Sequence, residues 1–289
     1  MSVRKAVILA AGYGTRLLPA TKAQPKEVLP LVDKPIIQYA VEEAVASGLQ
    51  QVIIVTSAGK RAIQDHFDRS PDLEQRLEAN GDRARLDDLR RISNLANIVY
   101  VRQQEPNGIG DAVLTARDVV GNEPFVLFFP DDVIVSDVPA ARQLIEIFEA
   151  QGGSVLAVQE VPPEEVPSYG IVDGEAVGEG VYRVKTLVEK PRLADAPSNL
   201  AIVGRYVLTP EIFDAVTKTP PGKGGEIQIT DALSLLLRDQ PIFACRFQGR
   251  RYDTGRPLGL LTASIELALQ RPDIGPELRR YLRALDLSG

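Results

Sequence analysis

Histidine, cysteine and tryptophan are nearly absent from this sequence of 289 residues, which has one His, one Cys and no Trp. Cys245 has no second cysteine to pair with, so a disulfide within the chain is excluded and a reducing compartment is expected. A zinc site of His and Cys ligands needs three or four of them, and only two exist. A catalytic triad would have to use His66, which we expect to be a solvated surface residue. Any catalysis is therefore predicted to work without histidine.

Excess positive charge and long apolar runs are missing as well. The chain has 33 Lys+Arg against 39 Asp+Glu, a net charge of −6, so it offers no basic face for nucleic acid. No stretch approaches the ~20 apolar residues of a membrane span. The first residues lead directly into a strand-like segment, without the pattern of a signal peptide. We therefore expect a cytoplasmic protein with no nucleic-acid and no membrane partner.

Strands and helices alternate through the first 160 residues. Helical spacing predicts helices over 36–47, 111–117 and 140–150, and short apolar runs predict strands near 6–11, 52–55, 98–101, 125–129 and 154–159. This alternation is typical of a mostly parallel sheet with helices on both faces. The charged excursion over residues 60–97 is interpreted as an inserted, largely solvated pair of helices.

After residue 160 the pattern changes. Gly-rich turns separate strand-like segments at 169–174 and 181–188, which is typical of antiparallel pairing. Another strand is predicted at 202–208, followed by a helix that begins at Thr209-Pro210-Glu211 with Thr209 as its cap. We therefore divide the chain into residues 1–160, residues 161–255 of the same globular unit, and a helical tail over 256–289.

Glycines follow the first strand, in Leu9-Ala10-Ala11-Gly12-Tyr13-Gly14-Thr15-Arg16. At the carboxyl end of a parallel strand they let backbone N–H groups approach a phosphate or a base, although a tight turn alone would also use them. The dinucleotide fingerprint needs a glycine where this chain has Leu17, and no Gly-Lys-Ser/Thr closes a Walker loop. An NAD-dependent dehydrogenase is therefore disfavoured.

Prolines stiffen the next loop, which contains Pro25-Lys26-Glu27-Val28-Leu29-Pro30. They restrict the backbone and hold Lys26 in a set direction. A lysine in a loop is ordinarily a solvated charge. One held between prolines beside a Gly-rich strand end is a candidate phosphate contact.

These motifs together resemble the sugar-1-phosphate nucleotidylyltransferases, and among them the bacterial UTP–glucose-1-phosphate uridylyltransferases. The signature is Gly12-x-Gly14-Thr15-Arg16 followed by Pro25-Lys26-x-x-Leu29-Pro30. The resemblance extends to about residue 260 through Arg102-Gln103 to Gly108-Ile109-Gly110, Pro130-Asp131-Asp132, Val188-Glu189-Lys190-Pro191, Gly225-Glu226-Ile227-Gln228-Ile229-Thr230-Asp231 and Gly249-Arg250-Arg251-Tyr252-Asp253-Thr254-Gly255.

The resemblance implies an α/β fold with a Rossmann-like, mostly parallel (mixed) central sheet and helices on both faces. Residues 1–160 would bind the nucleotide. The antiparallel part, residues 161–255, would bind the sugar phosphate. The helical C-terminal tail has apolar positions that could contact another subunit. Since relatives form dimers and tetramers, we expect a homodimer or homotetramer.

Pro130-Asp131-Asp132 places two acids after the buried strand 125–129, at the edge where open α/β sheets bind ligands. By themselves they are equally consistent with a turn or a helix cap. Mg²⁺ prefers one or two carboxylates together with waters and substrate phosphates. The resemblance implies that Asp131 binds Mg²⁺ and that Asp253 is the second acid at the metal. The role of Asp132 is left open.

The resemblance also implies the nucleotide contacts. The Gln103 amide has a donor and an acceptor that suit the edge of a pyrimidine, and Gly108 would let the base approach the backbone. Many relatives carry His where this chain has Asp111, which we interpret as a helix-start residue without a catalytic role. The remaining implied contacts to UTP are Ala10, Ala11, Gly12, Gly14 and Glu27.

Glu189-Lys190-Pro191 follows the predicted strand 181–188. Taken alone, Glu189 and Lys190 are a surface ion pair worth under ~1 kcal/mol. The resemblance implies that Glu189 binds glucose hydroxyls, that Lys190 holds the phosphate of glucose 1-phosphate, and that the sugar lies over Gly170. It implies that Arg16 and Lys26 hold the triphosphate of UTP.

The implied reaction joins UTP and glucose 1-phosphate into UDP-glucose, with pyrophosphate leaving. A phosphate monoester has a second pKa of about 6, so this nucleophile needs no general base. One alternative is a thymidylyltransferase that uses dTTP, because the base contacts tolerate a methyl group. Another is a non-catalytic regulatory protein of the same fold, against which the presence of Lys26, Lys190, Asp131 and Asp253 counts.

Overall fold

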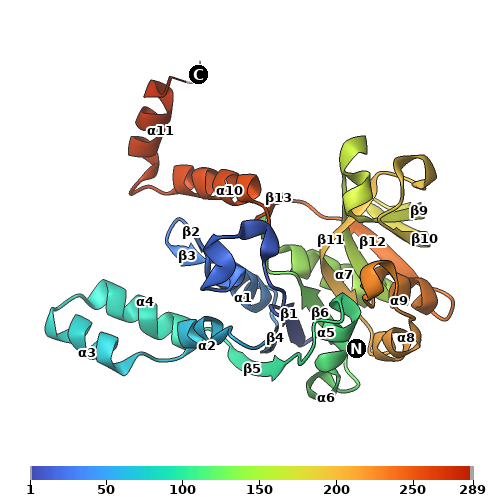
Figure 1. The fold of residues 1–289 in the computed structure, drawn as a ribbon, viewed down its shortest axis with the longest axis horizontal. Coiled ribbons are helices and arrows are strands. Elements are labelled where there is room, and N and C mark those ends of the chain that lie inside the picture. Colours follow the sequence, from blue (N-terminus) through green and yellow to red (C-terminus); the bar gives the residue numbers. More distant parts are fainter. Residues whose placement is uncertain (1, 287–289) are drawn as a thin grey trace.

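A nine-stranded sheet forms the centre of the computed structural model, which describes residues 2–286 (Figure 1). Its strand order is β5-β4-β1-β6-β11-β8-β12-β10-β9. The strands are β1 (Lys5–Leu9), β4 (Gln51–Thr56), β5 (Asn97–Arg102), β6 (Phe125–Phe128), β8 (Ser154–Glu160), β9 (Gly170–Gly178), β10 (Val181–Glu189), β11 (Leu200–Leu208) and β12 (Ile242–Arg246).

Parallel and antiparallel pairs share this sheet. Strands β5, β4, β1 and β6 are parallel neighbours, whereas β11 is antiparallel to both β6 and β8. The hairpin of β9 and β10 is antiparallel, as the Gly-rich turns predict. The predicted α/β fold with a mixed central sheet is confirmed. Because β11 lies between β6 and β8, strands from both sides of residue 160 interleave in one sheet.

Helices cover both faces of the sheet around β1, β4 and β6, which explains why these three strands are almost entirely apolar. In β1, Val7 packs into one apolar cluster, and Ala6 and Ile8 pack into the other. The first cluster includes side chains of α5 (Ile109–Thr115), α6 (Arg117–Val120), α8 (Ile212–Lys218) and α9 (Ile229–Leu236). The second includes side chains of α1 (Ile36–Ala46), α2 (Arg61–Phe67) and α7 (Ala140–Gln151).

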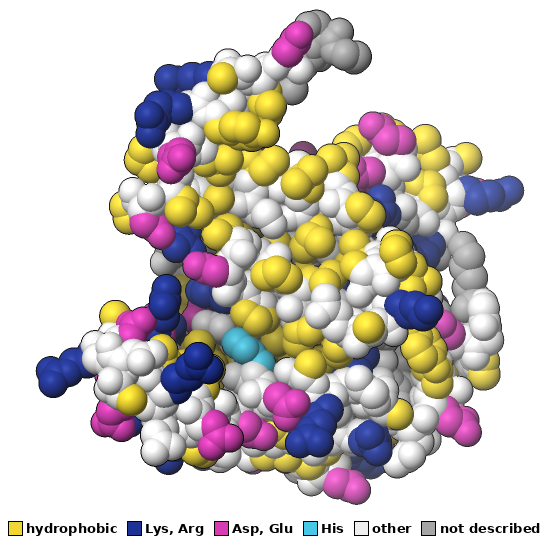
Figure 2. All heavy atoms as spheres, turned by 60° about the vertical axis from the view of Figure 1, so that its left-hand side comes forward, with side chains coloured by type: hydrophobic (Ala, Val, Ile, Leu, Met, Phe, Trp, Pro, Cys, Tyr) yellow, Lys and Arg dark blue, Asp and Glu magenta, His cyan; other side chains and the backbone are white. Residues whose placement is uncertain are grey.

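The excursion after β4 contains three helices rather than the predicted pair. Helices α3 (Pro71–Ala79) and α4 (Arg83–Ser93) form a projecting arm with charges of both signs on its surface (Figures 1 and 2). The additional helix, α2, buries Ile63 and Phe67 against the sheet. Two buried residues in seven are too few to produce a recognisable helical pattern.

Partial burial of His66 contradicts the expectation of a solvated histidine. Its Nε2 lies 2.9 Å from Gln38 Oε1, between α2 and α1. Burial lowers the pKa of His66 below its ordinary value, although the charge of Glu42 acts in the opposite direction.

The predicted cap of α8 is also wrong. The helix begins at Ile212, and the Thr209 hydroxyl accepts a hydrogen bond from Gln240 Nε2 at 2.7 Å instead of capping the helix. Thr209 contributes its carbonyl oxygen, which accepts the N–H of Ile212 at 3.1 Å. The local pattern predicts that the Thr209 hydroxyl caps the helix, but in the structure this hydroxyl forms a tertiary hydrogen bond with Gln240 instead.

The tail consists of two helices, α10 (Pro257–Gln270) and α11 (Gly275–Ala284), and Pro272 lies in the break between them. Helix α10 packs against the small sheet of β2 (Pro30–Leu31) and β3 (Lys34–Pro35), whereas α11 extends away from the body (Figure 1). The predicted tail continues through residues 287–289, which lie outside the described residues. Among the described helices, none is long and apolar enough to cross a membrane.

A second small sheet places acidic side chains beside the main one. Strand β7 (Asp132–Val135) follows β6 and pairs antiparallel with β13 (Arg250–Asp253), the strand that precedes α10. The register sets Asp253 opposite Asp132. Residues that are 119 and 123 positions apart in the sequence, such as Asp132 with Arg251 and Asp131 with Thr254, therefore meet at the carboxyl end of β6.

Candidate active site

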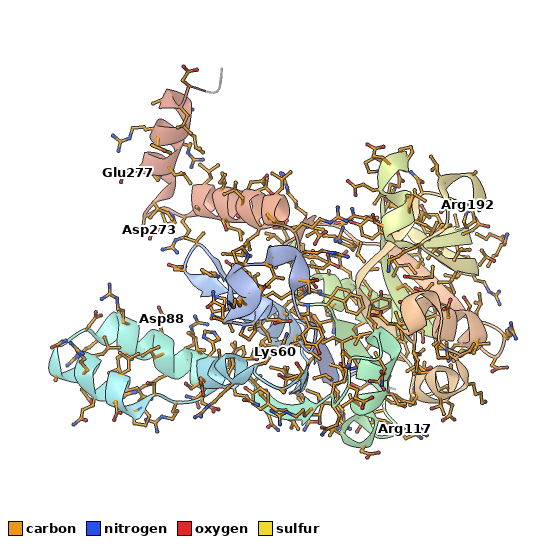
Figure 3. All side chains as sticks on the ribbon, in the orientation of Figure 1. Lys60, Asp88, Arg117, Arg192, Asp273 and Glu277 are labelled. Atoms are coloured by element: carbon orange, nitrogen blue, oxygen red, sulfur yellow. The ribbon has the colours of Figure 1, made fainter. Side chains whose placement is uncertain are left out.

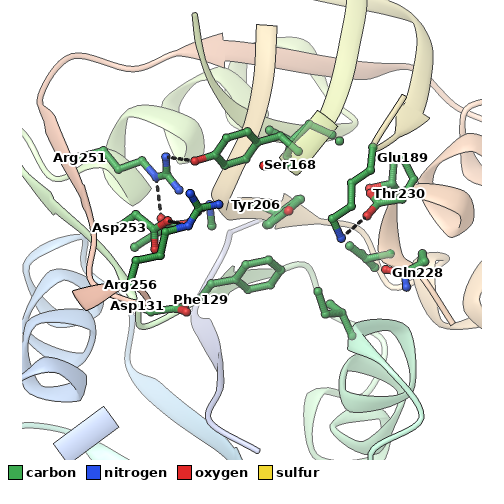
Figure 4. A pocket seen from close by; sticks show the side chains of 18 of the residues that line it. Phe129, Asp131, Ser168, Glu189, Tyr206, Gln228, Thr230, Arg251, Asp253 and Arg256 are labelled. Atoms are coloured by element: carbon green, nitrogen blue, oxygen red, sulfur yellow. Dashed lines mark hydrogen bonds and ion pairs between the residues drawn. The ribbon is translucent and has the colours of Figure 1, made fainter. Parts of the chain in front are cut away.

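Two cavities meet at the carboxyl ends of β1 and β6. The first, which we call the Gly12 cavity, is lined by the loop after β1, the Lys26 loop and the start of α5. The second, the Glu189 cavity, is lined by the ends of β9 and β10 and by the start of α9 (Figure 4). Asp131, Phe129 and Ile109 line both cavities. Ligands in the two cavities would therefore meet beside Asp131.

Most residues predicted to bind the nucleotide line the Gly12 cavity. A Cβ on Gly12 would meet no atom within 4 Å, so this position is open to a ligand. Ala10 does not line either cavity: it is fully buried, and its N–H is donated to Val55 O at 2.8 Å. The predicted residues that do line the Gly12 cavity are Ala11, Gly12, Gly14, Lys26, Glu27, Gln103 and Gly108.

Lys26 is held at the junction of the cavities by its own loop. Gly14 has a φ of 67°, and its carbonyl oxygen accepts a hydrogen bond from Thr21 Oγ1 at 2.8 Å. A Cβ on Gly14 would come within 3.1 Å of Lys26 Cβ, so the glycine allows the two loops to pack closely. Lys26 Nζ then lies 2.5 Å from Asp131 Oδ2.

The Lys26–Asp131 pair favours its charged forms. Burial opposes both charges, but the attraction between them outweighs it. The pKa of Lys26 is therefore raised and the pKa of Asp131 is lowered relative to their ordinary values. A phosphate placed beside this pair would meet an ammonium group that keeps its proton.

Glu27, the next residue, forms its ion pair with Lys60. The Lys60 ammonium donates to both carboxylate oxygens of Glu27, at 2.8 and 2.9 Å. The pair is almost fully buried, and burial raises the pKa of Glu27 and lowers the pKa of Lys60. Lys60 immediately precedes α2. In Figure 3 it lies in the body of the protein, whereas Asp88 lies on the projecting arm and Glu277 on the tail. Nothing in the charged excursion distinguishes this lysine from its solvated neighbours, so the sequence does not reveal it.

Gly108 lines the Gly12 cavity, and the packing around it gives a further reason for a glycine at this position. Its φ is 105°, and a Cβ there would lie 2.8 Å from both Glu226 Cβ and the Ile227 carbonyl oxygen. The missing side chain thus makes room for the segment before α9, and the approach of a base to the Gly108 backbone stays a prediction. Nearby, the Gln103 amide donates to Asp111 Oδ2 at 2.7 Å. Asp111 is in the first turn of α5, as predicted.

Glu189, Lys190 and Gly170, for which the resemblance implies binding of the sugar phosphate, all line one cavity. Lys190 Nζ lies 2.8 Å from Glu189 Oε1. A Cβ on Gly170 would lie 2.9 Å from Thr230 Oγ1 and 3.3 Å from Glu189 Oε2, so a larger residue would narrow the cavity.

The backbone of Lys190 is strained. Its φ is 43°, in the left-handed region that costs a non-glycine residue about 1–3 kcal/mol. Its N–H is donated to the Tyr169 carbonyl oxygen at 3.0 Å, which holds the turn. Strain of this kind is concentrated at functional sites, which agrees with the role that the resemblance assigns to this lysine.

Asp131 and Asp253 converge on one point. A Cβ on Gly255 would lie 2.8 Å from Asp131 Oδ2 and 3.1 Å from Asp253 Oδ1. Residues 2–286 contain no group of three or more His, Cys, Asp and Glu side chains arranged to hold a metal ion. Two carboxylates nevertheless suit Mg²⁺, which takes its remaining ligands from water and substrate phosphates. The residues present therefore fit a magnesium ion that is bound together with a phosphate substrate.

Comparison with known proteins identifies the family. Residues 5–270 match the sequence model of the family described as "Nucleotidyl transferase". The chain belongs to the nucleotidyl transferase family. It is 50% identical over 283 residues to the UTP--glucose-1-phosphate uridylyltransferase of Bacillus subtilis. The match covers 98% of this chain and 97% of the relative.

Solved structures of the family agree with this match. A UDP-glucose pyrophosphorylase complexed with UDP-glucose has a TM-score of 0.85 and 44% identity, and the match covers 93% of this chain and 100% of that one. A UTP-bound UGPase from Acinetobacter baumannii has a TM-score of 0.89 and 37% identity, covering 98% of this chain and 100% of that one. The resemblance to bacterial UTP–glucose-1-phosphate uridylyltransferases is thus confirmed.

Arg16 of this nucleotidyl transferase lines the Glu189 cavity rather than the Gly12 cavity. It shares that cavity with Arg256, whose Nε lies 3.4 Å from Asp253 Oδ2. The sequence predicts a triphosphate contact for Arg16. This contact stays a prediction, because the two cavities adjoin at Asp131 and Arg16 lines one of them.

Arg251 is a site residue that the sequence reasoning missed. Its Nε lies 2.6 Å from Asp132 Oδ1, and it donates from a terminal nitrogen to the Tyr169 hydroxyl at 3.2 Å. Asp132 Oδ2 accepts the N–H of Gly204 at 2.8 Å, so Asp132 joins β7, β11 and β13. Arg251 and Asp253 are two positions apart on β13, so their side chains lie on the same face of the strand. This alternation is the sequence signal that could have placed Arg251 in the site beside Asp253.

Proposed function

We propose that this nucleotidyl transferase forms UDP-glucose and pyrophosphate from UTP and glucose 1-phosphate. A phosphate oxygen of glucose 1-phosphate attacks the α-phosphorus of UTP. The bond from that phosphorus to the oxygen that bridges to the β-phosphate breaks, and pyrophosphate leaves with its electron pair. The observation that carries the proposal is the meeting of the two cavities at Asp131, with the Lys26 ammonium 2.5 Å from it.

Positive charge at this junction is what the reaction needs, because two anions must approach each other in line. In the proposal Lys26 holds the α-phosphate and Lys190 holds the incoming phosphate. Mg²⁺ held by Asp131 and Asp253 would supply further positive charge to the phosphates. The nucleophile is mostly dianionic at pH 7, with a second pKa of about 6, so it needs no general base.

The two cavities divide the substrates by chemistry. The Gly12 cavity combines glycines and the Gln103 amide, which suit a base and its phosphates. The Glu189 cavity combines a carboxylate, the Lys190 ammonium and the hydroxyl of Thr230, which suit sugar hydroxyls and a phosphate. The named relatives, uridylyltransferases and UDP-glucose pyrophosphorylases, support UTP and glucose 1-phosphate as this pair.

The test is pyrophosphate release with glucose 1-phosphate and Mg²⁺, comparing UTP, dTTP, CTP, ATP and GTP. We expect a strong preference for UTP and loss of the activity when the metal is chelated. Equal or better use of dTTP would make the protein a thymidylyltransferase. Release with none of the nucleotides would favour the non-catalytic alternative and overturn the proposal.

A further inference from the structure

The orientation of the Gln103 amide is fixed by the protein. Its Nε2 donates to Asp111 Oδ2 at 2.7 Å and faces the Gly108 carbonyl oxygen at 3.4 Å. A carboxylate and a carbonyl only accept hydrogen bonds, so both must face the NH2 group and not the oxygen of the amide. The Gln103 backbone N–H is donated to Thr56 O at 2.8 Å, which anchors the residue at the end of β5.

This orientation leaves Oε1 as the amide atom that can serve a ligand in the Gly12 cavity, which Gln103 lines. Oε1 accepts hydrogen bonds and donates none. Uracil and thymine carry an N–H at ring position 3, between two carbonyl groups. Cytosine has a lone pair at this position. An amide that presents only its oxygen can accept the N3–H of uracil or thymine but offers no donor to the N3 lone pair of cytosine.

We infer that Asp111 is a positioning residue that makes the nucleotide cavity select bases with an N3–H over cytosine. It acts by holding the NH2 group of Gln103 away from the ligand. Without Asp111 the amide can rotate by half a turn and offer its NH2 group to the N3 lone pair of cytosine. The inference rests on the proposed function, since it concerns the nucleotide that enters the reaction.

The experiment measures kcat/KM for UTP, CTP and dTTP with glucose 1-phosphate. The variants are Asp111→Ala, Asp111→Ser, whose side chain is too short to reach Gln103, and Asp111→Asn, which keeps an acceptor oxygen. We expect Ala and Ser to lower the UTP/CTP ratio roughly ten- to hundredfold, the range for one buried hydrogen bond lost or left unpaired. Asparagine should retain most of the ratio. Asp118→Ala, an exposed acid on α6, is the matched control and should change neither ratio.

The ratio of kcat/KM for UTP to that for dTTP distinguishes a positioning effect from a general loosening of the cavity, because thymine has the same N3–H as uracil. This UTP/dTTP ratio should stay unchanged in every variant. An unchanged UTP/CTP ratio in the Ala and Ser variants would overturn the inference, and so would a parallel fall of both ratios. A wild-type protein that does not use UTP would instead overturn the proposed function.

Discussion

Two neighbouring residues of one turn, Lys26 and Glu27, each form an ion pair, and the two pairs differ in their energetics. Lys26 pairs with Asp131 at the junction of the cavities, where the side chains are 20% and 26% exposed. Glu27 pairs with Lys60 inside the protein, where the values are 1% and 8%. In the first pair both pKa shifts favour the charged forms, and in the second both favour the neutral forms.

The difference shows how one turn can serve both a ligand and the scaffold. Desolvation of a buried pair can exceed the attraction between its charges, so the Glu27–Lys60 pair adds little net stability but is costly to break. Its effect is to tie the turn to the start of α2. The Lys26–Asp131 pair is only partly buried, so its ammonium remains within reach of a phosphate. Replacing single lysines by methionine separates the two roles.

Lys60→Met is expected to have the largest effect on stability. It leaves the Glu27 carboxylate buried without its partner, which costs about 3–5 kcal/mol of unfolding free energy. The measurement is urea unfolding. Lys185→Met is the matched control, because Lys185 pairs with Glu175 in an exposed position, where we expect a loss of under ~1 kcal/mol.

A double variant checks the cause of that loss. Glu27→Met together with Lys60→Met removes both buried charges, and such replacements are often neutral or stabilising. It should recover most of the stability lost in the single variant. A Lys60→Met protein as stable as the wild type would show that the pair is not buried as described.

Lys26→Met is expected to affect turnover and to leave stability nearly intact. Losing one preorganised positive group at the reacting phosphates should lower kcat about 10²- to 10³-fold, equivalent to about 3–4 kcal/mol. The assay is pyrophosphate release from UTP and glucose 1-phosphate, with urea unfolding in parallel. Lys185→Met should leave both readouts unchanged. Near-normal turnover of the Lys26→Met enzyme would remove Lys26 from the proposed chemistry.

The sequence predicts Lys26 but not Lys60, and the reason is physical. Lys26 is enclosed by prolines and glycines, whose backbone restrictions make a local pattern that can be recognised. Lys60 begins a charge-rich segment, and its burial depends on α2 folding back onto the Lys26 loop. Such a tertiary contact leaves no local pattern. The partial burial of His66 leaves no local pattern for the same reason, since it depends on a contact between His66 of α2 and Gln38 of α1.

The sheet shows the same division. Buried runs such as Phe125–Phe128 are apolar on both faces, so their existence and strand character follow from the sequence. Strand order does not, because β11 enters between β6 and β8 through pairings that link distant segments. The convergence of Asp131 and Asp253 depends on the register of β7 with β13, so the sequence shows it only through resemblance.

The change of unfolding free energy with pH is the smallest expected effect. Its sign differs between the Asp131 carboxyl and the Glu27 carboxyl. The pKa of Asp131 is lowered from 3.8, so its stabilisation is present above that value and is lost as the pH falls through the folded-state pKa. The pKa of Glu27 is raised from 4.5, so the folded protein takes up its proton first and gains stability as the pH falls toward 4.5. Unfolding free energies measured between about pH 3 and pH 6 should therefore fall less steeply with acid in Asp131→Asn than in the wild type, and more steeply in Glu27→Gln. Deviations of the same sign in both variants would contradict the opposite environments of these two carboxylates, because each variant removes only one of the two titrations.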